Sequence, residues 1–146
     1  MTAETSLAKG LTLSQLSIGQ RHEESFHISD EIIRRYAEIS GDNNPIHLDD
    51  AYAAASALKG RAAHGMLLAG LVSAVLGTRF PGLGTIVADV TLRFLRPIRP
   101  GEQITIRVVV RDILPAKNRV VIETICLNSV GKPAVTGQAV VLPPAG

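Results

Sequence analysis

The segment SGDNNPIHLDD, residues 40–50, holds a carboxylic acid and a histidine close together in the chain. Asp42 precedes His47 by five positions. Between them Pro45 fixes its own φ angle and restricts Asn44 before it. Such a loop is rigid, which suits two groups that bind one water molecule and move its protons. The same residues would equally form an ordinary turn followed by a helix, and their spacing alone leaves both interpretations open.

The segment HGMLL, residues 64–68, opens an apolar run and offers a second kind of chemistry. Backbone N–H groups at a helix start are unpaired and lie at the positive end of the helix dipole. Gly65 would present its N–H to a carbonyl oxygen or a developing oxyanion with no side chain in the way, and His64 would shape the site beside it. Alternatively, Gly65 only permits close packing and His64 caps the helix.

Ser73 and a group of arginines are further candidates. Ser73, within GLVSAVLG, could orient a carboxylate across the core, or its hydroxyl could bond back to the preceding turn. No Gly-x-Ser-x-Gly elbow surrounds it, so we do not expect a serine nucleophile. The stretch TLRFLRPIRP could contact an anionic ligand such as a phosphorylated cofactor, or form a solvated edge, through Arg93, Arg96 and Arg99. The histidines are not paired at metal-ligand spacing, so we expect no metal site.

The residues around these candidates predict three helices. SDEIIRRYAEISG, residues 29–41, begins with a capping serine and two acids and ends on a glycine. DDAYAAASALKG, residues 49–60, predicts a short helix that ends at Gly60. AAHGMLLAGLVSAVLGTRF, residues 62–80, predicts a longer helix that is apolar nearly all round, and such a helix is expected to be buried.

The second half of the chain predicts strands. Runs rich in β-branched residues, separated by turn compositions, occupy residues 85–97, 102–114, 119–130 and 133–143, and residues 21–29 could add a short strand. Helices that come early and strands that come late indicate an α+β class with an antiparallel sheet. One long apolar helix beside about five strands indicates a hot-dog arrangement, in which the sheet wraps around a central helix.

Length and composition fit one folded domain. The chain has 146 residues, 46% of them hydrophobic and 19% charged, so we take residues 1–146 as one domain with residues 1–13 as an irregular arm. A net charge of +2 with scattered basic residues gives no nucleic-acid footprint. The lone Cys126 alternates with apolar residues and is expected to be a buried thiol.

We expect neither a signal peptide nor a membrane-spanning segment. The N-terminal residues lack a basic start followed by an apolar stretch. The longest apolar helical stretch, MLLAGLVSAVLG at residues 66–77, is too short to cross a bilayer. The sequence therefore predicts a cytoplasmic protein with no membrane partner.

The chain resembles the R-specific enoyl-CoA hydratases of the MaoC-like dehydratase family in YAEISGDNNPIHLDDAYAA, in AAHGMLLAGLVSAVLG and in PGLGTIVADVTLRFLRPIRPGEQITIRVVV. The resemblance covers about residues 14–142. It implies a hot-dog fold and a homodimer of protomers paired edge to edge, with active sites at the interface. It also implies reversible addition of water to a trans-2-enoyl thioester of coenzyme A, giving the (R)-3-hydroxyacyl thioester, with no metal or redox cofactor.

The resemblance also implies roles for individual residues. Asp42 matches the catalytic acid and His47 the catalytic histidine, with the division of proton transfer between them left open. Gly65 matches the residue whose backbone N–H holds the thioester oxygen. Asn44 matches a residue that shapes the site, and Ser73 matches a serine that orients the acid.

Two departures from the family, Asn43 and Gly70, leave the preferred acyl chain length open. Three alternative functions stand beside the hydratase. The first is a dehydratase that acts on acyl chains carried by a protein, and the second is a hot-dog thioesterase. The third is a non-catalytic hot-dog subunit, which would not need both Asp42 and His47.

Overall fold

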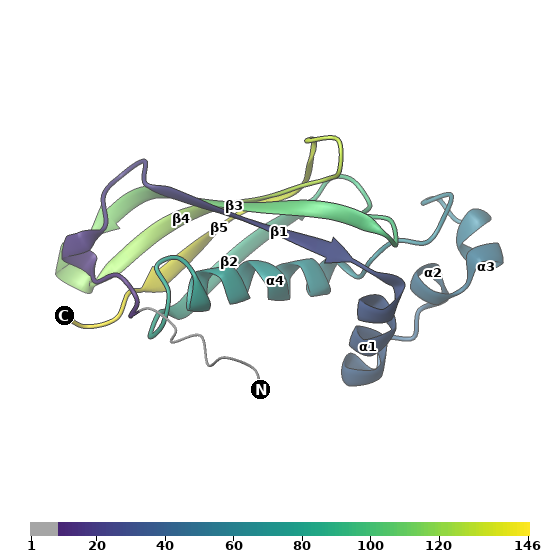
Figure 1. The fold of residues 1–146 in the computed structure, drawn as a ribbon, viewed down its shortest axis with the longest axis horizontal. Helices are drawn as coiled ribbons and strands as arrows, with labels where there is room; N and C mark the ends of the chain where they lie inside the picture. Colours follow the sequence, from purple (N-terminus) through teal and green to yellow (C-terminus); the bar gives the residue numbers. More distant parts are fainter. Residues whose placement is uncertain (1–8) are drawn as a thin grey trace, which may run out of the picture.

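The computed structural model describes residues 9–146, and its framework is one antiparallel sheet of five strands (Figure 1). The strand order is β1-β3-β4-β5-β2, so β1 and β2 form the two edges. The strands are β1 (Arg21–Ile28), β2 (Ile86–Phe94), β3 (Glu102–Leu114), β4 (Arg119–Leu127) and β5 (Pro133–Leu142). All five predicted strands are therefore present, and the predicted antiparallel α+β class is confirmed.

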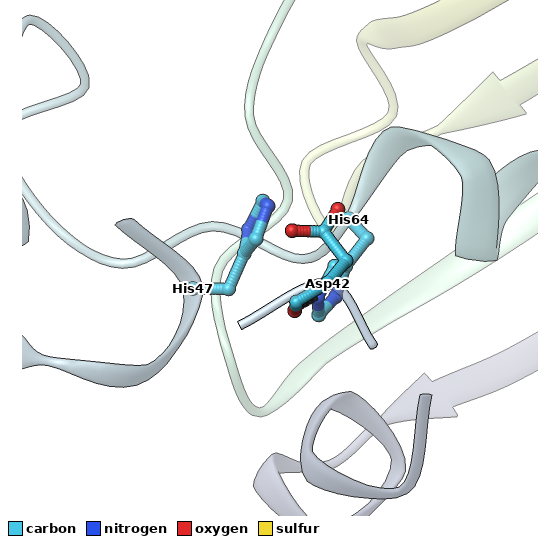
Figure 2. A group of neighbouring side chains, drawn as sticks. All are labelled: Asp42, His47 and His64. Carbon is cyan, nitrogen blue, oxygen red and sulfur yellow. Dashed lines mark hydrogen bonds between the residues drawn. The ribbon is translucent and has the colours of Figure 1, made fainter. Parts of the chain in front are cut away.

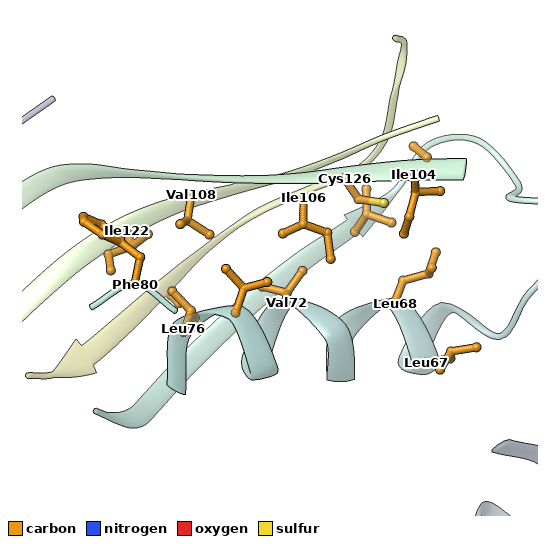
Figure 3. Packing of buried hydrophobic residues seen from close by; sticks show 14 of the residues in the cluster. Leu67, Leu68, Val72, Leu76, Phe80, Ile104, Ile106, Val108, Ile122 and Cys126 are labelled. Carbon is orange, nitrogen blue, oxygen red and sulfur yellow. The ribbon is translucent and has the colours of Figure 1, made fainter. Parts of the chain in front are cut away.

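The long helix α4 (Gly65–Thr78) lies along one face of this sheet (Figure 1). Leu68, Val72 and Leu76 point from α4 to the sheet (Figure 3) and are almost fully buried. Opposite them, Ile104 and Ile106 of β3 have no exposed surface. Since apolar burial is the main source of folding stability, this helix–sheet interface is the core, and the predicted hot-dog arrangement is confirmed.

The prediction that α4 is buried all round is wrong for this chain. The helix begins at Gly65 and has an exposed side that includes Met66, Gly70, Ser73 and Ala74. The sheet covers only one face of a helix, so the apolar residues that point away from it stay in solvent. Small side chains on that side leave the helix backbone open to approach by another surface.

The first predicted helix is confirmed together with both of its ends. In α1 (Asp30–Ser40), Ser29 caps the start, and its hydroxyl accepts a hydrogen bond from the Ile32 N–H at 3.2 Å. Gly41 ends α1 with a φ of 76°, a left-handed conformation that glycine adopts without strain. The chain therefore leaves α1 at a fixed angle into the segment that carries the acid.

The second predicted helix is shorter than the sequence indicated. Two short helices, α2 (Pro45–Leu48) and α3 (Asp50–Ala54), follow the loop, and the helix expected to reach Gly60 ends at Ala54. The Ser56 hydroxyl causes this difference, because it donates to the Ala53 carbonyl at 2.6 Å and accepts from the Leu58 N–H. These bonds replace the next helical turn with a tight turn.

The predicted irregular arm, residues 1–13, lies mostly outside the described residues. Its described end is tied down, because Lys9 forms an isolated bridge with Leu83 and the Leu11 N–H donates to Pro81. Two single-turn 3-10 helices complete the fold: η1 (Leu13–Gln15) and η2 (Pro115–Lys117).

Cys126 is fully buried, as predicted, and burial raises the pKa of its thiol to about 11. Within residues 9–146, no helix is long and apolar enough to cross a membrane.

We expect Ile106→Ala to lower the free energy of unfolding by about 2–5 kcal/mol, because it leaves a cavity between β3 and α4. Thr105→Ala is the control, since the neighbouring half-buried side chain of the same strand should cost less than about 1 kcal/mol. Urea denaturation of both variants measures the difference. Equal losses would mean that the core does not lie between β3 and α4.

Candidate active site

The loop between α1 and α2 is held by its own side chains. The Asp42 N–H donates to the Ser40 hydroxyl at 3.1 Å, and Asp42 Oδ1 accepts from the Asn44 N–H at 3.3 Å. Asn44 Oδ1 then accepts from the Ile46 N–H at 3.3 Å and caps α2, with Pro45 at the start of that helix. Asn44 thus shapes the loop as a capping residue.

His47 lies on α2 and is buried, and one of its ring nitrogens is already engaged. Its Nδ1 lies 2.7 Å from the carbonyl oxygen of Ala62. Because a carbonyl can only accept, Nδ1 carries the hydrogen. In the neutral ring this leaves Nε2 with a lone pair, which makes Nε2 the atom that can accept a proton.

The backbone of His47 is fixed as well. Arg61 Nε donates to the His47 carbonyl oxygen at 2.8 Å, and its guanidinium also pairs with Asp30 of α1. The same guanidinium holds the pKa of the Asp30 carboxyl below its usual value. Arg61 therefore ties α2 to the first turn of α1.

His64 is the third polar side chain at this position, and only 1% of its surface is exposed. Its Nε2 donates to the main-chain carbonyl oxygen of Asp42 at 3.0 Å. Its ring stacks on the ring of His47 with the centroids 3.8 Å apart. Burial lowers the pKa of His64, so the neutral ring is favoured.

Asp42, His47 and His64 form one cluster (Figure 2), in which a potential ligand atom from each lies within 4.8 Å of the others. Residues of these types also bind transition metals. The two rings, however, are stacked with their centroids 3.8 Å apart and their planes at 28°, so their lone pairs lie in nearly parallel planes, which does not favour convergence on one ion. The arrangement suits hydrogen bonds to a water molecule better than the coordination of a cation.

A cavity of about 270 Å³ lies beside His47, and Gly65 is part of its wall. Gly65 is the first residue of α4, where backbone N–H groups have no partner within the helix. A Cβ atom at this position would lie 2.6 Å from Cε1 of Phe94, so a larger residue would require the Phe94 ring to move. The cavity therefore brings together an imidazole and a helix start free of side chains.

A second cavity, of about 480 Å³, also has Phe94 in its wall and is mostly apolar. Phe94 therefore lines both cavities. Gly70, one of the two departures from the family, lies in the wall of this second cavity. The other departure, Asn43, lines a small separate hollow beside α1.

Four residues that the sequence suggested have different surroundings. Ser73 lies on the exposed side of α4, and among residues 9–146 no hydrogen bond joins it to Asp42. The Arg99 guanidinium donates to the carbonyls of residues 58, 60 and 61, so it holds that loop together. Arg93 is exposed on β2, and Arg96 borders the first cavity.

Sequence reasoning missed two residues at the site, Phe94 and Arg61. Phe94 belongs to β2 and reaches Gly65 only because the sheet folds back over α4. Arg61 has no motif around it, and its side chain is 9% exposed only because α1 and α2 close over it. No local pattern could have indicated either contact.

The fold and the site together define a hot-dog protein with an acid–histidine pair beside a glycine-led helix start. The family described as MaoC like domain matches residues 14–129, and the chain belongs to this family. It is 43% identical over 118 residues to the (R)-specific enoyl-CoA hydratase of Rhodospirillum rubrum, a match that covers 81% of each chain.

Other relatives agree with this assignment. The (R)-specific enoyl-CoA hydratase of Aeromonas caviae is 36% identical over 131 residues, which cover 90% of this chain and 98% of the relative. The solved structure of the R-hydratase PhaJ1 from Pseudomonas aeruginosa superposes with a TM-score of 0.88 at 41% identity. That match covers 94% of this chain and 88% of PhaJ1.

We expect the burial of His64 to make the protein less stable in acid. Its pKa lies below the ordinary 6.5 in the folded chain, so below about pH 6.5 the unfolded chain binds a proton that the folded chain does not. This contribution is complete above pH 6.5 and is lost as the pH falls towards the folded pKa. We compare the free energy of unfolding in urea at about pH 8 and at about pH 5. The decrease between the two pH values should be smaller in His64→Gln than in the unmodified protein. His27→Gln, which removes an exposed histidine of β1, is the control. An unchanged difference in His64→Gln would contradict the prediction.

Proposed function

We propose that this protein is an (R)-specific enoyl-CoA hydratase, which adds water reversibly to trans-2-enoyl-CoA and gives (R)-3-hydroxyacyl-CoA. The observation that carries the proposal is the cluster of Asp42 and His47 beside a cavity walled by Gly65. Relatives with 36–43% identity that carry this name or the name 3-hydroxybutyryl-CoA dehydratase support it.

In the proposed mechanism, Asp42 and His47 bind the water between them. His47 Nε2 accepts one O–H of the water, because Nδ1 already donates to Ala62. The Asp42 carboxylate accepts the other O–H. As the oxygen bonds to C3 of the enoyl group, the pair takes up one proton from the water. One proton is then delivered to C2, so both side chains end the cycle unchanged.

The proposed role of Gly65 is to stabilise the charge that develops on the substrate. When water adds to C3, the electrons of the C2–C3 double bond move towards the thioester oxygen. In the proposed complex, the Gly65 N–H at the start of α4 donates to this oxygen, at the positive end of the helix dipole. Removal of one such donor commonly costs about 10²–10³-fold in rate.

The cavities have proposed roles in substrate binding. The mostly apolar wall of the first cavity suits the reacting end of an acyl chain, and the second cavity, which Phe94 also lines, is mostly apolar and suits its tail. Arg96 is exposed at the edge of the first cavity and donates through Nη1 to the Pro133 carbonyl at 2.7 Å; its remaining guanidinium N–H groups are proposed to bind the phosphates of coenzyme A. No metal or redox cofactor enters the proposed reaction. The proposal includes a cytoplasmic location, which agrees with a reduced, lone Cys126.

A dehydratase that acts on acyl chains bound to a carrier protein is the second candidate. A relative from Arabidopsis thaliana, named 3-hydroxyacyl-[acyl-carrier-protein] dehydratase, is 30% identical over 108 residues that cover 74% of this chain and 64% of the relative. Hydration rates with crotonyl-CoA and with the crotonyl carrier-protein thioester distinguish the two substrates. Release of free thiol from either would instead indicate a thioesterase.

We expect Asp42→Asn and His47→Gln each to lower the hydration of crotonyl-CoA by about 10³-fold or more, because each removes one of the groups that bind the water. Loss of absorbance of the enoyl thioester follows the reaction. Asp50→Asn is the control, because its side chain is 90% exposed in the neighbouring helix α3. Near-normal rates in either site variant would refute the proposed acid–histidine mechanism, and an inactive subunit would show no hydration before any substitution.

The proposal also includes a homodimer formed through β2. This strand is an edge of the sheet, so within residues 9–146 its outer backbone groups pair with no other strand. It also exposes apolar side chains, with Ile86 60%, Val90 41% and Phe94 52% exposed. An edge of this kind is suited to pairing with a second copy, which would also cover the exposed side of α4.

Val90→Lys should therefore convert the dimer to a monomer, because it places a charge in the middle of the paired edge. Sedimentation equilibrium measures the mass of the particle. Val130→Lys is the control, since Val130 is 73% exposed in the turn between β4 and β5. A Val90→Lys protein that remains dimeric would exclude β2 as the interface.

A further inference from the structure

His64 occupies the capping position of α4 and does not cap the helix. It is the residue before Gly65, and its side chain makes no capping hydrogen bond with the first turn. The ring instead turns back into the protein, where 1% of its surface remains exposed. A buried polar ring at a helix start must therefore be explained by what it contacts.

The contacts of His64 join three segments that are separate in the chain. Its Nε2–H donates to the carbonyl oxygen of Asp42 at 3.0 Å, in the loop after α1. One ring face stacks on His47 of α2 at 3.8 Å. Tyr36 of α1 packs against the ring with the centroids 4.7 Å apart and the planes tilted by 59°. His64 is thus the common neighbour of both proposed water-binding residues.

We propose that His64 is a positioning residue for the acid–histidine pair: its Nε2–H fixes the main chain of Asp42 to the start of α4, and its ring face fixes the plane of His47. The inference rests on the proposed hydratase function, because the pair is assigned to catalysis there. Since the main chain of His64 leads directly into Gly65, one residue sets the water-binding groups relative to the oxyanion donor.

The second ring nitrogen of His64, Nδ1, indicates that packing alone does not explain a histidine at this position. Nδ1 is buried and has no hydrogen-bond partner among residues 9–146. A buried acceptor without a partner costs about 1–3 kcal/mol, a cost that an apolar ring of similar size would avoid. The histidine is therefore unfavourable for packing alone, and the bond from Nε2 to Asp42 is what a phenylalanine could not provide.

Two variants separate the two contacts. His64→Phe keeps a ring face against His47 and loses the N–H donor to Asp42. His64→Gln keeps an N–H donor of similar reach and loses the ring face. For each protein the experiment measures kcat and KM for crotonyl-CoA, the melting temperature, hydrogen exchange of the Asn43 and Asn44 amides, and the ¹⁵N signals of the His47 ring. His22→Phe is the matched control, because His22 lies on β1 away from the cluster.

We expect each variant to lower kcat by about tenfold to 10²-fold, because small misplacements of reacting groups have effects of this size. KM should stay within about threefold, since His64 is not among the residues that line either cavity. His64→Phe should speed exchange at Asn43 and Asn44 and leave the His47 signals unchanged. His64→Gln should give the opposite pattern. The melting temperature of His64→Phe should change little, because removal of the unpaired Nδ1 offsets the loss of the bond from Nε2 to Asp42.

The proposal is overturned if kcat stays within about threefold of the unmodified value in both variants. It is also overturned if both variants disturb the loop and His47 equally while the melting temperature drops, which is the result of general loosening. If one variant does not fold, the other still tests its own contact. An unmodified protein that does not hydrate any enoyl thioester would refute the proposed function, whereas the exchange and ¹⁵N measurements would still decide whether His64 positions the pair.

Discussion

Two imidazole N–H groups that donate to main-chain carbonyls connect the parts of this protein that carry its chemistry. His47 donates to Ala62, and His64 donates to Asp42, so the loop after α1 and the segment before α4 are linked in both directions. The Ala63 N–H in turn donates to the carbonyl of Ile98 at 2.7 Å, beyond the end of β2. Because α4 is fixed by the core, these bonds transfer the rigidity of the sheet to the site.

The same bonds determine the electrical state of the site. The Ala62 carbonyl accepts from His47 Nδ1, and the Asp42 carbonyl accepts from His64 Nε2. Each ring in its neutral form therefore has one defined tautomer, with the lone pair on its other nitrogen. Burial lowers the pKa of His64 and so favours its neutral ring, which keeps a positive charge away from the stacked His47 ring. A neutral His47 ring accepts a hydrogen bond from water at Nε2, next to the Asp42 carboxylate, as the proposed hydration requires.

The sequence predicted features that depend on near neighbours. Ser29 and Gly41 mark the ends of α1 through local capping chemistry, and the alternating β-branched runs mark the strands. The sequence-based prediction of a helix that reaches Gly60 was wrong, because the Ser56 hydroxyl competes with the helical hydrogen bonds. A serine in an alanine-rich run gives too little signal to predict this.

Features of the site that depend on distant segments were beyond such reasoning. Asp42, His47 and Gly65 were candidates from their types and spacing, and the family resemblance assigned their roles. The bond from His64 to Asp42, however, depends on how α1 and α4 meet. Arg99 looked like a ligand for an anion, yet its guanidinium is occupied by the carbonyls of residues 58, 60 and 61. Arg99 and the carbonyls that it binds are separated by 38 to 41 positions in the sequence, so only the folded chain shows these bonds.

The strand order has a consequence for how the chain is made. Within residues 9–146 the edge strand β2 pairs only with β5, the fifth strand in chain order, while α1 and α4 leave the ribosome before four of the five strands. The apolar face of α4 therefore remains exposed to solvent until the strands that bury it have been synthesised. Sheets closed by such distant pairings fold slowly, so the nascent chain passes through a period in which its future core is exposed to chaperones and to other chains.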